Sequence, residues 1–157
     1  MVHIRDLIDY NVEVRHRYFS LLTQLSWEEV VKNREASWHS MRNIFIHTLG
    51  AVNHWLNLLQ DEKYHLDKNF ENYTSPEDLQ RLMVKTEERM CKYLSSLDQD
   101  GLQQKYTVRN DSGETIEVTA EDILIHVFEE EVHHRGEIIA LLWQIKVEPP
   151  LMGWKCL

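Results

Sequence analysis

The segment from residue 125 to residue 139 places carboxylates and imidazoles within an otherwise apolar helical pattern. Glu130 and His134 are four residues apart, so on a helix they lie about one turn apart and can reach a single ion. His126 also lies one turn from Glu130, but roughly 12 Å of helix rise separates His126 from His134, so the three cannot share one ion. We choose Glu130 and His134 as the ligand pair because they lie nearer to the apolar face.

A third ligand must come from another helix, and His47 is the best candidate because it flanks an apolar helical face. His54 lies on the same flank, but about 10 Å of rise separates it from His47, which makes it a pocket residue and not a co-ligand. Two imidazoles and one carboxylate suit zinc, iron, nickel or manganese and leave coordination positions free for chemistry. Spacing alone still favours the simpler alternative, in which these residues bind no metal, because Glu/His pairs four residues apart recur on solvated helices.

Two further charged residues, Glu131 and Arg135, share the apolar face of the same segment. A buried carboxylate or guanidinium carries a desolvation cost unless it is paired. Their spacing predicts an intrahelical ion pair that closes off the site. Arg135 could also hold an anionic substrate, since a guanidinium binds carboxylate and phosphate groups.

Four long segments carry apolar residues at steps of three and four, which predicts four amphipathic helices in an all-α bundle. Ser75, Pro76 and Thr119 are typical helix starts, and β-prone runs around residues 110–113 predict a small hairpin before the last helix. The predicted helices span residues 4–25, 37–60, 75–97 and 119–146, within one domain of residues 1–157.

Composition excludes several functional classes. The 17 basic and 26 acidic residues give a formal charge of -9 and no basic run, which argues against nucleic-acid binding. The longest apolar run is too short to cross a membrane, so we expect a cytoplasmic protein. Cys91 and Cys156 lack the spacing of a disulfide scaffold or zinc ribbon, and we expect Cys91 to be a packed thiol.

The combined motifs resemble the DinB/YfiT-like metal-binding bundles. They comprise His47 with Trp55 eight residues later, the run His133-His134-Arg135-Gly136, and the closing segments 141–144 and 148–150. The resemblance covers nearly the whole chain and implies an up-down-down-up four-helix bundle. It also implies one divalent ion held by three histidines, one on the second helix and two spaced by four on the last helix.

His47 and His134 match two of those three histidines, and Glu130 stands at the remaining position. The resemblance therefore implies either a His-His-Glu variant of the metal site or a site that has been weakened or lost. A carboxylate ligand shifts preference from soft metals toward zinc, iron or manganese.

The resemblance further implies an enzyme of the thiol S-transferase type that acts on a small molecule with a low-molecular-weight thiol, and a homodimer. In the leading hypothesis His47, Glu130 and His134 hold the ion, and Glu130 and Arg135 are the catalytic candidates. One alternative is a metal-dependent hydrolase in which Glu130 is the general base. Another is a non-catalytic interaction bundle whose polar patch is a salt-bridge network.

Overall fold

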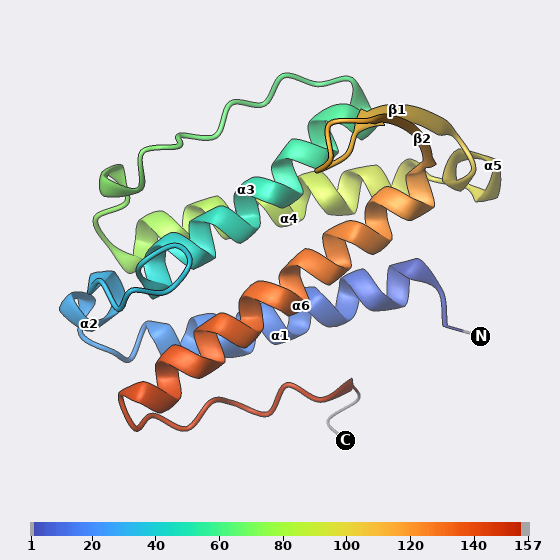
Figure 1. Ribbon diagram of the computed structural model, residues 1–157. Coiled ribbons are helices and arrows are strands. Elements are labelled where there is room, and N and C mark those ends of the chain that lie inside the picture. Colours follow the sequence, from blue (N-terminus) through green and yellow to red (C-terminus); the bar gives the residue numbers. More distant parts are fainter. Residues whose placement is uncertain (1, 155–157) are drawn as a thin grey trace.

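Four long helices form the body of the molecule in the computed structural model, which describes residues 2–154 (Figure 1). Short helical segments and one β-hairpin connect them. The long helices are α1 (Ile4–Leu22), α3 (Met41–Gln60), α4 (Pro76–Ser96) and α6 (Ala120–Gln144). The connecting elements are α2 (Trp27–Val31), the 3-10 turn η1 (Phe70–Asn72), α5 (Gln99–Leu102), β1 (Lys105–Arg109) and β2 (Thr115–Thr119).

The order of helix directions confirms the up-down-down-up bundle. α3 and α4 run the same way, because the segment between them returns along the whole length of the bundle before α4 begins (Figure 1). α1 and α6 run in the opposite direction. α3 packs against both α4 and α6, and α1 packs against α6, so residues of α3 and α6 can meet along a shared seam.

The start of α6 is fixed by a reciprocal cap. The Asp122 backbone N–H donates to the Thr119 hydroxyl at 3.1 Å, and the Thr119 N–H donates to the Asp122 carboxylate at 2.8 Å. These bonds, led by the one from the Thr119 backbone, hold the pKa of Asp122 below its usual range. Such a cap contributes about 1 kcal/mol and sets the register of every later residue on α6.

Some helix ends differ from the sequence prediction. α3 begins at Met41 with Ser40 as its cap, four residues after the predicted start, because His39 adopts a left-handed conformation with φ 71° that a helix cannot contain. α1 ends at Leu22 and α6 at Gln144, where Lys146 has φ 59°. The starts of α4 and α6 were predicted correctly from their capping residues.

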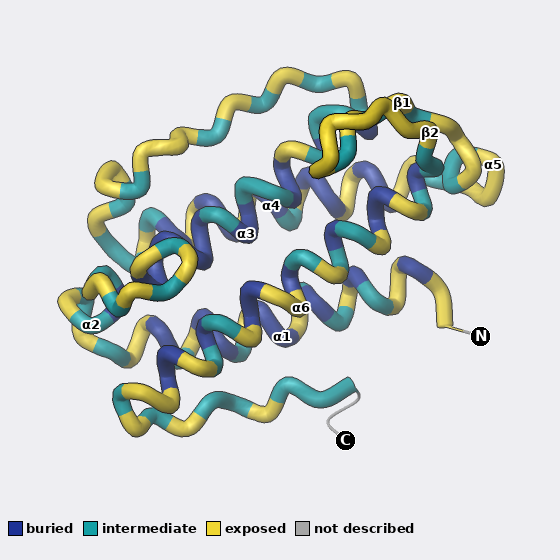
Figure 2. The backbone as a smooth tube through the Cα atoms, in the orientation of Figure 1, coloured by how far each residue is buried: buried dark blue, intermediate teal, exposed yellow. Residues whose placement is uncertain are grey.

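The buried core consists of two apolar clusters and a set of polar residues. The inward faces of all four long helices are buried (Figure 2). One cluster includes Phe45, Met83 and Leu142, and the other includes Leu56 and Leu124. Each long helix also contributes buried polar side chains, among them Asn11, Arg15, Asn53, Thr86, Glu131 and His134. We call this set the polar layer.

The predicted hairpin is present and antiparallel. Tyr106 pairs with Val118, and Gly113 in the turn has φ 82°, a conformation that glycine adopts without strain. The Tyr106 hydroxyl donates to the Leu59 carbonyl at 3.2 Å, which ties the hairpin to the end of α3.

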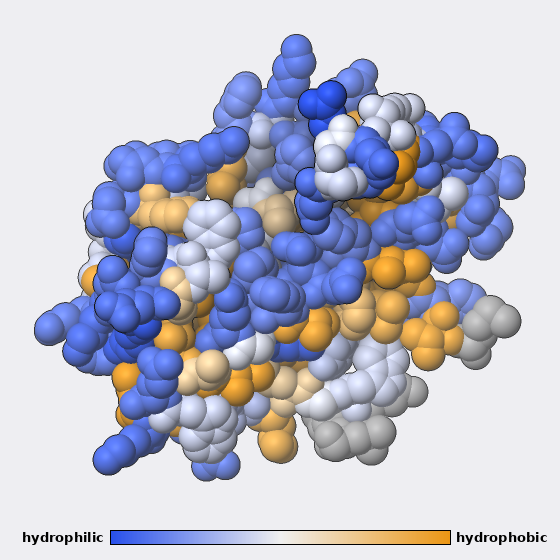
Figure 3. All heavy atoms as spheres, in the orientation of Figure 1, coloured by the Kyte–Doolittle hydropathy of each residue, from blue (hydrophilic) through white to orange (hydrophobic). Residues whose placement is uncertain are grey.

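Hydrophilic residues predominate on the face in Figure 3, with hydrophobic residues interspersed along α6. None of the helices in residues 2–154 is long and apolar enough to cross a membrane. Cys91 is exposed, so the prediction of a packed thiol was wrong: it lies on the outer side of α4. Cys156 lies outside the described residues.

Candidate metal site

His47 of α3 and Glu130 and His134 of α6 come together on the seam between these helices. One possible ligand atom from each lies within 4.8 Å of the others. Nε2 of His134 is 3.4 Å from a Glu130 oxygen, and the rings of His47 and His134 are 4.6 Å apart at 84°. Ligand atoms around one zinc ion, bound at about 2.0–2.2 Å, are separated by about 3–4 Å. Small side-chain rotations therefore bring all three atoms to coordination distance.

Trp38 packs against the ring of His47. The indole stacks on the imidazole with ring centroids 3.9 Å apart and an interplanar angle of 18°. Phe70 of η1 in turn contacts Trp38 edge-on at 6.0 Å. Trp38 was not predicted as a site residue because it lies in the loop before α3, where helical spacing gives no information about contacts.

The three candidate ligands are buried to different degrees. His134 belongs to the polar layer and is 6% exposed, whereas His47 and Glu130 are half-buried. Burial, with the neighbouring His134 as a second cause, lowers the pKa of His47 below its ordinary value. His47 is therefore neutral at pH 7 and its ring nitrogen has a free lone pair, as a metal ligand requires.

The other ring nitrogen of His134 faces Glu137. Nδ1 of His134 lies 2.7 Å from a Glu137 carboxylate oxygen. Burial opposes ionisation of Glu137, but hydrogen bonds from Ser37 and His134 outweigh it and lower the pKa of this carboxyl. His133, His134 and Glu137 form a second group whose potential ligand atoms are close enough to hold an ion. The four-residue spacing that paired Glu130 with His134 did not identify Glu137 as a residue of the site.

Glu131 faces the opposite side of α6 and binds Arg15 of α1. Arg15 donates from Nε at 3.1 Å and from a terminal nitrogen at 2.5 Å, and it also pairs with Glu87 of α4 at 2.7 Å. The predicted ion pair between Glu131 and Arg135 was therefore wrong. Burial by itself lowers the pKa of Arg15, but the carboxylates, led by Glu131, raise it overall, so the guanidinium stays charged.

Arg135 lies toward α1, away from the seam between α3 and α6. Its guanidinium carbon is 5.1 Å from the centre of the Tyr10 ring, and the residue is 9% exposed. This is the geometry of a cation–π contact. Binding of an anionic substrate by Arg135 stays a prediction.

Two further histidines near the seam, His126 and His54, lie outside the triad of His47, Glu130 and His134, as their spacing predicted. His126 contacts Trp55 edge-on at 5.3 Å, and His54 contacts the same indole at 5.2 Å. Since His126 is one turn from Glu130, this aromatic group lies beside the triad along the seam.

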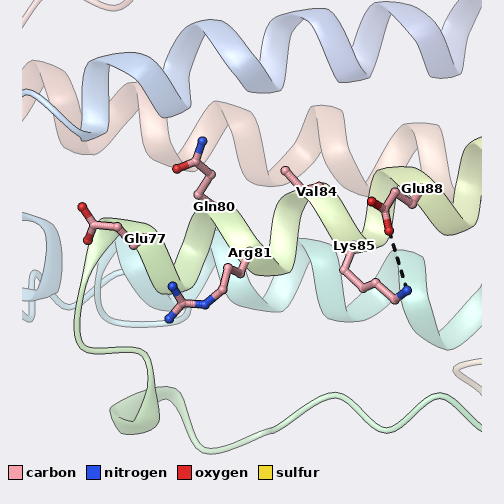
Figure 4. Close-up of a pocket in the computed structure, with 6 residues that line it drawn as sticks. All are labelled: Glu77, Gln80, Arg81, Val84, Lys85 and Glu88. Carbon is pink, nitrogen blue, oxygen red and sulfur yellow. Dashed lines mark ion pairs between the residues drawn. The ribbon is translucent and has the colours of Figure 1, made fainter.

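A surface hollow on α4 does not coincide with the triad. Its lining is drawn in Figure 4 and comes from a single helix, with one apolar residue and a Lys85–Glu88 ion pair at 3.6 Å. The lining residues are Glu77, Gln80, Arg81, Val84, Lys85 and Glu88. No imidazole or thiol belongs to this lining, so the triad is the better candidate site.

The model of the DinB family matches residues 1–154, and this chain belongs to the DinB family. The protein YizA of Bacillus subtilis strain 168 is 23% identical over 141 residues, which cover 90% of this chain and 87% of YizA.

Two crystal structures share the fold. A DinB-like protein from Bacillus cereus ATCC 10987 matches with a TM-score of 0.69 and 16% identity over 94% of this chain and 93% of that one. The DinB-like protein YjoA from Bacillus subtilis matches with a TM-score of 0.67 and 16% identity over 93% and 96% of the two chains. At this identity the likeness supports the fold alone.

Proposed function

We propose that this protein binds one divalent metal ion through His47, Glu130 and His134, and that it is a metal-dependent enzyme of the thiol S-transferase type. The proposal rests on one observation: the possible ligand atoms of these residues, contributed by two helices, lie within 4.8 Å of one another. Two imidazoles and a carboxylate are a donor set that zinc, iron and manganese accept.

The chain's own residues suit this chemistry. His47 is neutral at pH 7, so it need not release a proton to bind an ion. The ligand set carries a single negative charge, from Glu130, so a divalent ion bound to these three ligands would keep a net charge of +1. A bound divalent ion supplies Lewis acidity and lowers the pKa of a coordinating thiol or water.

The half-buried positions of His47 and Glu130 place the site at the edge of the polar layer. A small molecule can therefore reach it without opening the core. In the proposed reaction a thiol sulfur forms a bond to an electrophilic carbon, the bond to the leaving group breaks, and the thiol proton passes to solvent. The thiol transfer itself is supported by the family resemblance.

The first experiment is elemental analysis of protein purified without a histidine tag, followed by titration with zinc. We expect one ion per chain and a higher Tm with added zinc, because a ligand that binds only the folded state stabilises it. Absence of stoichiometric metal, with no shift from zinc, nickel, iron or manganese, would overturn the proposal.

Glu130→Gln then separates a ligand from a base. Loss of zinc in this variant identifies Glu130 as a ligand, whereas retained zinc with lost turnover would identify it as a general base. Glu129→Gln is the matched control because Glu129 is exposed and adjacent on the same helix. Turnover is followed as thioether formation from L-cysteine and chlorodinitrobenzene, with chloride released; no zinc-dependent rate would contradict the transferase assignment.

A further inference from the structure

We propose that Glu137 is a positioning residue that accepts the Nδ1–H of His134 and thereby directs Nε2 of this ring toward Glu130 and His47. The consequence for metal affinity rests on the proposed function above. The position of the proton does not, because it is a property of the metal-free protein.

The two nitrogen atoms of His134 have different surroundings. Nδ1 is 2.7 Å from the Glu137 carboxylate, which is a hydrogen-bond distance. Nε2 is 3.4 Å from Glu130. A neutral imidazole has one N–H donor and one acceptor nitrogen, and the donor is favoured where the closer carboxylate lies.

These distances also discriminate between the two groups that could hold an ion. Two ligands of one zinc ion, each bound at about 2.0–2.2 Å in tetrahedral geometry, are about 3.3–3.5 Å apart. The 3.4 Å between Nε2 and Glu130 matches that separation, whereas the 2.7 Å between Nδ1 and Glu137 is too short for it. Glu137 is therefore placed as a hydrogen-bond acceptor for Nδ1, and this geometry favours the group of His47, Glu130 and His134 over the group of His133, His134 and Glu137 as the metal site.

The loop before α3 lies beside both histidines. Its Trp38 stacks on His47 with ring centroids 3.9 Å apart, and the adjacent Ser37 is one cause of the lowered pKa of Glu137. A carboxylate behind a ligating histidine fixes the ring and increases its basicity, and its loss typically costs 10–100-fold in metal affinity.

The test begins with ¹⁵N-labelled, metal-free protein at a pH where His134 is neutral. Long-range ¹H–¹⁵N spectra assign the protonated nitrogen of each ring. We expect the Nδ1–H form for His134 in the wild type, its loss in Glu137→Ala, and its retention in Glu137→Gln, whose amide oxygen can still accept the bond. An Nε2–H form in the wild type, or no change in Glu137→Ala, would overturn the proposal. If Glu137→Ala does not fold, the wild-type spectrum alone decides.

Zinc affinity provides the second readout. We expect Glu137→Ala to weaken zinc binding by about 10–100-fold and Glu137→Gln to weaken it less. His133→Ala is the matched control, because His133 is exposed and belongs only to the competing group. A similar loss in His133→Ala would refute the assignment of Glu137. If the wild type bound no zinc but showed the Nδ1–H form, the proposed function would fail while the positioning of His134 by Glu137 stood.

Discussion

Glu130 and Glu131 are adjacent in sequence but lie in two different regions of the bundle. Glu131 is 6% exposed and is bound by Arg15, so its charge is compensated inside the protein. Glu130 is half-buried and faces the imidazole of His134 at 3.4 Å. The charge of Glu131 is compensated by a guanidinium inside the core, whereas Glu130 faces an imidazole at the edge of the core and is available to an external cation.

The largest change in the free energy of unfolding is expected from breaking the buried ion pair between Arg15 and Glu131. Arg15→Met leaves Glu131 buried without its cation, which should lower the free energy of unfolding by about 3–5 kcal/mol. Urea denaturation of metal-free protein measures it. Glu130→Gln should change the same quantity by less than about 1 kcal/mol, because this side chain is partly solvated and has no guanidinium partner.

A double variant sharpens this first prediction. Arg15→Met combined with Glu131→Leu removes both buried charges and should recover much of the stability lost in Arg15→Met alone. No recovery would mean that Arg15 stabilises the fold by packing or through Glu87, and the contrast between the two acids would lose its electrostatic basis.

The second-largest effect is expected at the candidate metal site. Zinc at about 100 times its Kd should add about 2.7 kcal/mol to the unfolding free energy of the wild type. His47→Gln, Glu130→Gln and His134→Gln should each lose most of this gain, because each removes a ligand. Thermal unfolding with and without zinc checks it. An undiminished gain in all three variants would place the ion elsewhere.

A smaller effect is expected from Arg135, which lies on the Arg15 side of α6. Arg135→Met removes the cation–π contact with Tyr10 and should cost about 0.5–2 kcal/mol of stability. Zinc affinity should stay within about twofold of the wild type, because the Arg135 guanidinium packs on Tyr10 of α1 and not on the seam between α3 and α6. Titration calorimetry measures the zinc affinity separately from the stability. A large loss of zinc affinity would show that Arg135 is coupled to the candidate metal site.

The smallest effect is a pH dependence from His47. Its folded-state pKa lies below the ordinary value of 6.5, so the unfolded chain takes up this proton first as pH falls. The stability of the metal-free wild type should therefore decline as pH falls through about 6.5, and His47→Gln should decline less. Urea midpoints between about pH 7.5 and 5.5 measure the difference; equal slopes would show that His47 titrates as an exposed histidine.

Much of the fold followed from the sequence because long helices carry strong local patterns. Apolar steps of three and four located the four helices, and Thr119 marked the start of α6. The start of α3 was misplaced because Ser37 and Ser40 are both suitable caps, and only the left-handed conformation of His39 excludes the first.

The candidate site was predictable where its residues lie on regular helices. Glu130 and His134 are one turn apart, and His47 flanks the apolar face of α3. Contacts between distant segments were not predictable: spacing paired Glu131 with Arg135, whereas Arg15, 116 residues away, binds it with two nitrogens. Ser37 and Trp38 were missed for the same reason, since loop geometry places them.

The most direct test of the account is a crystal structure of the zinc-soaked wild-type protein with anomalous data at the zinc edge. We expect one strong anomalous peak per chain on the seam between α3 and α6, about 2.0–2.2 Å from a nitrogen of His47, Nε2 of His134 and an oxygen of Glu130. A peak beside His133 and Glu137, or no peak on this seam, would contradict it.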